Sequence, residues 1–222
     1  MMKPDLKIYN LIAAAVLFIG VPIALYAFGD FPRRSWLKEG LSIATLLAFS
    51  LMMGQFFLAR SNLAMLQIHT MMNVQRLHKA IAYGVLAVVL LHPFLIVLPR
   101  YFEAGVDPVD ALVTMLTSFN KPGVVLGEIA WVSMLVLSIT SIFRMRLIKR
   151  FKIKYRNWRY FHGGLSVVLV LAALIHSIAL GRHTDTPMMV FEITLTVIGL
   201  WLLAKLYFGA PDQKPATLEA KA

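Results

Sequence analysis

Four of the six histidines form two pairs with the same spacing. His78 and His92 are fourteen residues apart, and so are His162 and His176. On an α-helix, fourteen residues return to within ~40° of the same face and advance ~21 Å along the axis. Each pair would therefore present two imidazoles on one helix face at two depths.

Two imidazoles from facing helices are the axial ligands that a six-coordinate b-type haem requires. Pairing His78 with His162, and His92 with His176, supplies ligands for the irons of two stacked haem b groups. Any single histidine is more often an ordinary core residue, but ionisable side chains within membrane spans are costly and usually functional. The chain has no cysteine, which excludes disulfides, thiolate zinc sites, iron–sulfur clusters and covalently attached haem.

The elements that must position these histidines are predicted to be membrane spans. Of the 222 residues, 59% are hydrophobic and only 15% are charged, which leaves too little polar surface for a water-soluble domain. We predict an all-α integral membrane protein with one six-helix haem-binding domain over residues 1–208 and a disordered cytoplasmic tail over 209–222. The two haems would lie between the third and fifth spans. Six apolar stretches approach the ~20 residues that cross a bilayer: 10–29, 41–59, 80–98, 124–143, 163–180 and 188–208.

The net charge of +11 follows the expected topology. If the N-terminus is cytoplasmic, sixteen of the 22 lysines and arginines lie on the inner side, eight of them within residues 144–159. The positive-inside rule then predicts a multi-pass protein of the inner (plasma) membrane with both termini in the cytoplasm. His78 and His162 would form the inner level, and His92 and His176 the outer level.

Other residues are candidates for supporting roles. An Asp107-Pro108 start predicts a short amphipathic helix in the outer loop. His69 and His183 are expected to be ordinary loop residues, although His183 could contact an acceptor or a haem propionate. Glu128 and Glu192 are either proton carriers, partners of an arginine or solvated carboxylates. Cations that could bind the propionates are Arg76, Lys79 and Arg159 at the inner level and Arg182 at the outer one.

The chain resembles the ferric reductase-like transmembrane domain, the six-helix haem core of NADPH oxidases and ferric-chelate reductases. The resemblance implies two haems on the same histidine pairs and electron flow from the cytoplasm outward. Unlike the larger members, this sequence has no Gly-rich phosphate fingerprint, so FAD is expected only on a separate partner. The residues that carry the resemblance are Arg60-Ser61-Asn62, Leu77-His78-Lys79, His92, Trp158-Arg159-Tyr160-Phe161-His162 and His176.

We therefore predict a di-haem cytochrome b subunit of a membrane oxidoreductase, with no catalytic residue of its own. Its donor would be a cytoplasmic flavoprotein or a quinol, and its acceptor a ferric chelate, oxygen, a quinone or a periplasmic redox protein. One alternative is the haem subunit of a methionine sulfoxide reductase-type repair system. A second is a haem-free proton or metal transporter, although transport sites usually gather their ligands at one level rather than two.

Overall fold

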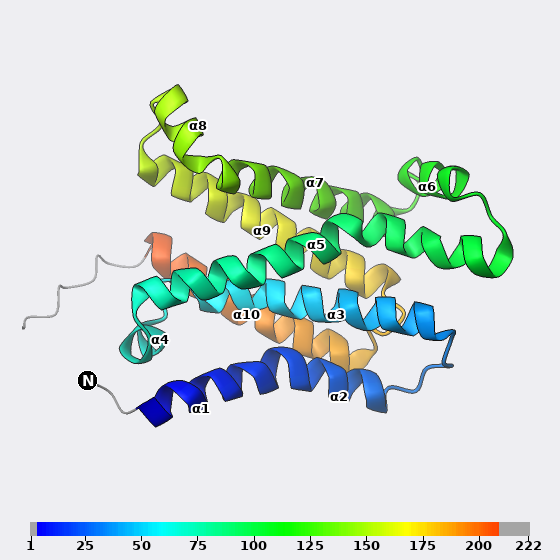
Figure 1. Ribbon diagram of the computed structural model, residues 1–222, viewed down its shortest axis with the longest axis horizontal. Coiled ribbons are helices and arrows are strands. Elements are labelled where there is room, and N and C mark those ends of the chain that lie inside the picture. The colour runs from blue at the N-terminus through cyan, green and yellow to red at the C-terminus, as the bar shows by residue number, and fades with distance from the viewer. Residues whose placement is uncertain (1–3, 209–222) are drawn as a thin grey trace, which may run out of the picture.

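The computed structural model describes residues 4–208, and within this part of the chain the only regular elements are helices, joined by short loops (Figure 1). Six helices are long and apolar enough to cross a membrane, which confirms the predicted fold class. The first combines α1 (Pro4–Ala15), η1 (Val16–Gly20) and α2 (Val21–Phe28). The others are α3 (Trp36–Phe57), α5 (Met71–Ala104), α7 (Pro122–Ile142), α9 (Tyr155–Leu180) and α10 (Thr186–Phe208). The predicted tail, 209–222, lies outside the described residues.

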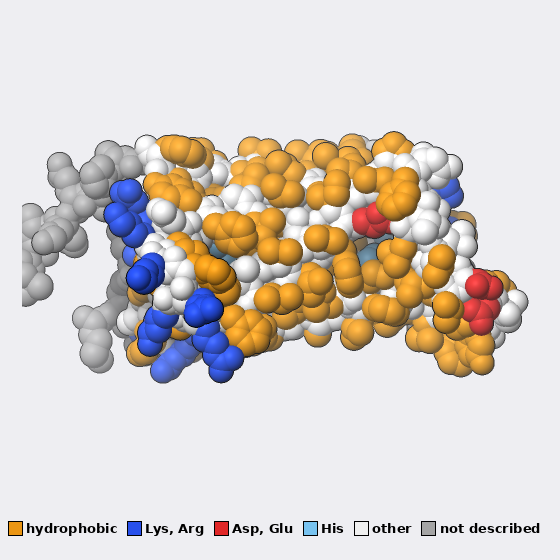
Figure 2. Space-filling model, turned by 90° about the horizontal axis from the view of Figure 1, so that it is seen from above, with side chains coloured by type: hydrophobic (Ala, Val, Ile, Leu, Met, Phe, Trp, Pro, Cys, Tyr) orange, Lys and Arg blue, Asp and Glu red, His pale blue; other side chains and the backbone are white. Residues whose placement is uncertain are grey.

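The long helices run side by side along the long axis of the molecule (Figure 1). At one end lie the short helices α4 (Leu63–Ile68) and α8 (Arg144–Phe151). Lysine and arginine side chains gather there (Figure 2), and we call it the basic end. The short helix α6 (Pro108–Leu116) lies at the opposite end, which we call the far end.

The two helices that carry the paired histidines are longer than their apolar stretches. α5 begins at Met71 and α9 at Tyr155, whereas hydropathy placed the span starts at 80 and 163. Hydropathy measures only the part that suits lipid, and a helix continues wherever its backbone is satisfied. The Thr70 hydroxyl, for example, caps α5 by accepting from the amide of Asn73 at 3.4 Å. His78 and His162 consequently lie inside regular helix.

Proline explains one contact between the first span and α3. Pro22 has no amide hydrogen, so the carbonyl of Phe18, four residues earlier, lacks its usual helical donor. The hydroxyl of Ser50 on α3 donates to that carbonyl at 2.8 Å. In a bilayer such a carbonyl finds no water, so the side-chain donor fixes the register of the two helices.

The core holds α5 and α9 in place through their neighbours. α7 packs along α9, α3 along α5, and α10 against α3. Gly199 allows the closest approach of α10, because a Cβ there would lie 2.9 Å from the Cβ of Phe56. On the face shown in Figure 2, the surface between the two ends is largely apolar, as expected for a surface that faces lipid. Buried core side chains include Phe18, Phe49, Met53, Leu169 and Val170.

Two connections between spans contain short helices. The predicted helix after Asp107 is confirmed as α6, and the Asp107 carboxylate accepts from the amides of Val109 and Asp110 at 2.8 and 3.0 Å. It ends at Leu116, earlier than the apolar residues up to Phe119 suggested. The basic connection 144–159 forms α8, a helix that the sequence analysis did not predict.

Candidate functional site

The two far-end histidines face each other across the bundle. His92 on α5 and His176 on α9 have ring centroids 6.3 Å apart, with planes at 88°. An imidazole nitrogen lies ~1.1 Å from its ring centroid and binds a metal at ~2.0 Å, so two rings on opposite sides of one metal have centroids ~6 Å apart. The pair therefore has the spacing of two axial ligands.

Hydrogen bonds determine which nitrogen of each ring is available. The Nδ1–H of His176 donates to the carbonyl of Gly123 at 2.7 Å. The Thr45 hydroxyl gives its hydrogen to the carbonyl of Leu41, so its oxygen accepts from Nδ1 of His92 at 3.3 Å. With Nδ1 protonated, Nε2 carries the lone pair that a metal requires. Both rings are thus held in the tautomer suited to ligation.

A glycine lets α7 pass directly over one of these rings. A Cβ at Gly127 would lie 2.5 Å from Nδ1 and 2.6 Å from Cε1 of His176. Gly163, by contrast, makes room for the ring of Tyr207, with a Cβ 2.7 Å from its Cε2. Gly163 therefore serves the packing of α10 on α9, whereas a Cβ at Gly84 or Gly164 would meet nothing within 4 Å.

The second histidine pair lies at the basic end. His78 and His162 are each the eighth residue of their helices, α5 and α9, which both begin at that end (Figure 1). Nδ1 of His162 is 3.2 Å from the hydroxyl of Ser141 on α7, and the Trp158 ring lies 5.0 Å from the His162 ring. All four paired histidines are half-buried, so each level keeps an accessible imidazole face.

The donor set fits haem at the far-end level, where two imidazoles face each other beside a cavity. No group of three or more histidine, aspartate or glutamate side chains within the described residues is arranged to hold a metal ion. Each level instead offers two imidazoles, and haem requires only two protein ligands because its macrocycle supplies the other four nitrogens. The two imidazoles would bind the iron of such a group, and the adjoining cavity would hold its macrocycle.

That cavity has a volume of about 730 Å³ and lies between α3, α5, α7 and α9, with His92 and His176 in its wall. Two carboxylates also line it. Glu192, only 2% exposed, accepts from the Ser177 hydroxyl at 3.2 Å through one oxygen, while its second oxygen and one oxygen of Glu128 have no partner within the described protein. The cations that line the cavity are Arg34, Lys38, Arg100, Lys121 and Arg182.

Comparison with known proteins settles the family. Residues 44–173, more than half of the chain, match the family described as the ferric reductase like transmembrane component. The chain belongs to this family. The matched range includes His78, His92 and His162, and His176 follows it by three residues. Membership in this family implies a membrane subunit that takes part in electron transfer. It also confirms the resemblance found in the sequence.

A similar protein occurs in an archaeon. An uncharacterized protein of Archaeoglobus fulgidus is 37% identical over 163 residues, which cover 73% of this chain and 86% of that protein. No solved structure matches the chain.

The structure brings one of the four predicted cations to the far-end cavity. Arg182 lines it and donates to the carbonyl of Pro32 at 3.1 Å. Arg159 turns its guanidinium over the ring of Tyr207, 6.0 Å from the centroid. Arg76 lies two residues before His78, ~200° around the helix, and lines a different pocket. Lys79 is exposed at the basic end.

A polar cluster that no sequence pattern predicted lies at the far end, and two of its members, Arg34 and His183, line the cavity. Glu39 is buried, accepts from the Tyr26 hydroxyl, and lies 3.1 Å from Nε of Arg34 and 3.7 Å from Nε2 of His183. Arg34 Nη2 is also 3.4 Å from His183 Nε2, although 149 residues separate them. Only the tertiary fold brings these residues together, so no local pattern could reveal the cluster.

His183 is consequently buried rather than an ordinary loop residue. Burial lowers the pKa of His183 below its usual value, and the cations Arg34, Arg182 and Arg33 lower it further against the opposing effect of Glu39. The ring is therefore neutral near neutral pH. Since Arg34 donates toward Nε2, Nδ1 carries the hydrogen, and this buried donor has no partner within the described protein.

Proposed function

We propose that this chain is a di-haem cytochrome b that carries electrons across the inner (plasma) membrane. One haem b would be held by His78 and His162 and the other by His92 and His176. The observation that carries the proposal is the far-end pair, with rings 6.3 Å apart and both Nδ1 atoms engaged. The matching fourteen-residue spacing extends the same argument to the basic end.

The chain's own residues would bind, orient and electrically balance this cofactor. Haem supplies a one-electron carrier when bound. Thr45, Gly123 and Ser141 fix the ring orientation and increase the basicity of the ligating imidazoles through their bonds at Nδ1. At the far end, Arg34, Arg100 and Arg182 would pair with propionates, because guanidinium groups bind carboxylates in a bidentate manner.

The direction of electron flow follows from the proposed orientation. Positive charge gathers at the basic end (Figure 2), so that end would face the cytoplasm, together with both termini. Electrons would enter there from a separate flavoprotein that holds FAD, or from a quinol. They would leave at the far end to an outer acceptor such as a ferric chelate, oxygen or a periplasmic redox protein.

Oriented vesicles test this direction. With an enclosed reductant supplying the basic end, an impermeant ferric chelate outside should be reduced. Arg182→Gln should slow this reaction by severalfold more than it slows superoxide formation, because an anionic chelate is attracted by the far-end cations and neutral oxygen is not. Arg146→Gln at the basic end is the matched control; with a small-molecule reductant, which needs no protein docking, it should leave both rates unchanged. Reduction of enclosed acceptors alone would show that the proposed orientation is wrong.

A further inference from the structure

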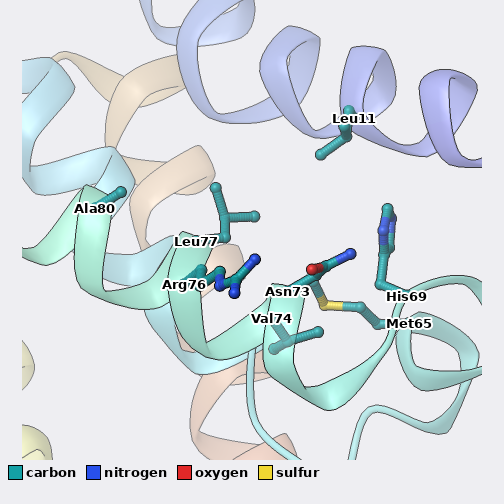
Figure 3. A pocket seen from close by; sticks show the side chains of 8 residues that line it. All are labelled: Leu11, Met65, His69, Asn73, Val74, Arg76, Leu77 and Ala80. Carbon is teal, nitrogen blue, oxygen red and sulfur yellow. The ribbon is translucent and has the colours of Figure 1, made fainter.

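A second pocket lies at the basic end, between α1, α4 and the first turns of α5 (Figure 3). Its volume is about 370 Å³. Figure 3 shows Leu11 reaching down from α1 toward His69 and the side chains of α5. The apolar wall consists of Leu11, Met65, Val74, Leu77 and Ala80, and the polar groups are His69, Asn73 and Arg76. An apolar pocket with a few convergent polar groups is the usual form of a small-molecule site.

His69 is held in a definite protonation state. It is only 8% exposed, and its Nε2 lies 2.9 Å from the side-chain oxygen of Asn10 on α1. That oxygen can only accept, so Nε2 carries the hydrogen. Burial lowers the pKa of His69, and the nearby charge of Lys7 lowers it further. The ring is therefore neutral, and Nδ1 is a hydrogen-bond acceptor.

The other two polar side chains complement this acceptor. Arg76 offers only donors, and the Asn73 amide offers both a donor and an acceptor. A hydroxyl group matches this set, because one hydroxyl can donate to His69 and accept from Arg76. A phosphate headgroup does not match it, because an ionised phosphate oxygen would face the lone pair of His69. The apolar wall requires that the rest of the ligand be a hydrophobic body.

We propose that this pocket binds the head group of a lipid-soluble hydroquinone. Its ring would lie against Leu77 and Val74, and one hydroxyl would donate to His69. Leu77 directly precedes His78 in the chain, so on α5 the ligand would lie one residue from a basic-end histidine, ~100° around the helix from it. Its role as an electron donor rests on the proposed function, whereas its binding does not.

Binding can be measured without electron transfer. Haem-replete protein in lipid nanodiscs is first reduced with dithionite and then titrated calorimetrically with a short-tailed 1,4-benzohydroquinone under argon. Leu77→Trp, which fills the pocket, and His69→Leu, which removes the acceptor, should each weaken binding at least tenfold. Leu91→Trp, at a lipid-exposed position of the same helix, is the matched control and should bind as the unmodified protein does.

The outcomes separate this proposal from the proposed function. The methylated hydroquinone ether, which has no hydroxyl donor, should bind as weakly to the unmodified protein as the hydroquinone does to His69→Leu. Equal hydroquinone affinity in all variants, or displacement by anionic phospholipid vesicles, would overturn the pocket assignment. A sample that holds haem but binds no hydroquinone refutes the pocket alone. A sample that binds hydroquinone but no haem refutes the di-haem function alone.

Discussion

At the scale of single residues, the partners of the imidazole Nδ1 atoms decide what the histidines can do. Spacing alone predicted that His78 and His92 share one helix face, and likewise His162 and His176, because helical geometry fixes that relation. That His92 and His176 face each other was a hypothesis about how the two helices pair. Spacing did not predict Thr45 or the carbonyl of Gly123 as their partners. Those contacts depend on the rotation of α3 and α7, which sequence periodicity does not determine.

The contact between Thr45 and His92 provides a test of whether the hydrogen bond at Nδ1 sets the haem potential. Thr45→Val keeps the shape of the side chain but removes the acceptor for Nδ1 of His92, so the imidazole becomes less basic and stabilises ferric iron less. We expect the midpoint potential of one haem to rise while the other is unchanged, as measured by redox titration. Thr140→Val is the matched control, because the Thr140 hydroxyl bonds only within its own helix. Equal shifts of both haems would contradict the assignment.

Gly127 provides a test of whether the His176 ring must keep its position to bind haem. Gly127→Ala adds a Cβ 2.5 Å from Nδ1 of His176, so the ring must leave the position set by Gly123. We expect the far-end haem to be lost and the basic-end haem to be kept, as measured by haem content per protein. Gly40→Ala on α3, where a Cβ meets nothing within 4 Å, should keep both. Full haem content in Gly127→Ala would show that the far-end ring does not ligate.

At the scale of elements, the helix types were predictable and their ends were not. Runs of apolar residues located all six spans, because only a helix satisfies its backbone within lipid. Hydropathy did not predict that α5 begins at Met71, because its first turns are polar and its start is set by the cap at Thr70. The loop 181–185 and the start of α3 form one cluster through Arg34, Glu39 and His183. Such contacts between distant segments leave no local trace in the sequence.

This cluster predicts how stability depends on pH. The pKa of His183 is lowered by burial first and then by Arg34, Arg182 and Arg33, with Glu39 opposing. An unfolded histidine titrates near ~6.5, so below that pH the unfolded chain binds more protons than the folded one. The stabilisation is complete above ~6.5 and is lost as the pH falls toward the folded pKa.

The thermal unfolding temperature should therefore fall on acidification below pH ~6.5. His183→Phe keeps an aromatic ring against Tyr26 and Phe31, whose rings now lie 4.8 and 4.9 Å from that of His183, but it cannot titrate. The variant should show a shallower pH dependence. The lowered pKa of His69 acts in the same direction, so part of the slope should remain. An identical slope in both proteins would refute the role of His183.

At the scale of the whole molecule, the charge distribution was readable from the sequence because the membrane sorts charge by side. The eight basic residues of 144–159 lie together at the basic end, where α8 and the start of α9 meet. What the sequence could not show is the cavity between α3, α5, α7 and α9, because its walls come from helices far apart in the chain.

The basic end also predicts how a separate donor protein would dock. Reduction by an acidic flavoprotein should slow with added salt, since charges are screened over ~8–10 Å at physiological ionic strength. Lys152→Glu with Lys154→Glu should slow it further at unchanged haem content, as measured by stopped-flow absorbance. Asn120→Glu at the far end is the control and should have no effect. Equal rates at low and high salt would assign the basic residues to membrane topology alone.

The most direct test of the central claim is the haem content of the purified protein, measured with its oxidised and reduced absorption spectra. We expect two low-spin b haems per chain. Replacing His92 or His176 with leucine should remove one haem and keep the other, and replacing all four paired histidines should remove both. A haem-supplied, folded protein without haem, or a haem that survives the loss of all four histidines, would refute the di-haem proposal.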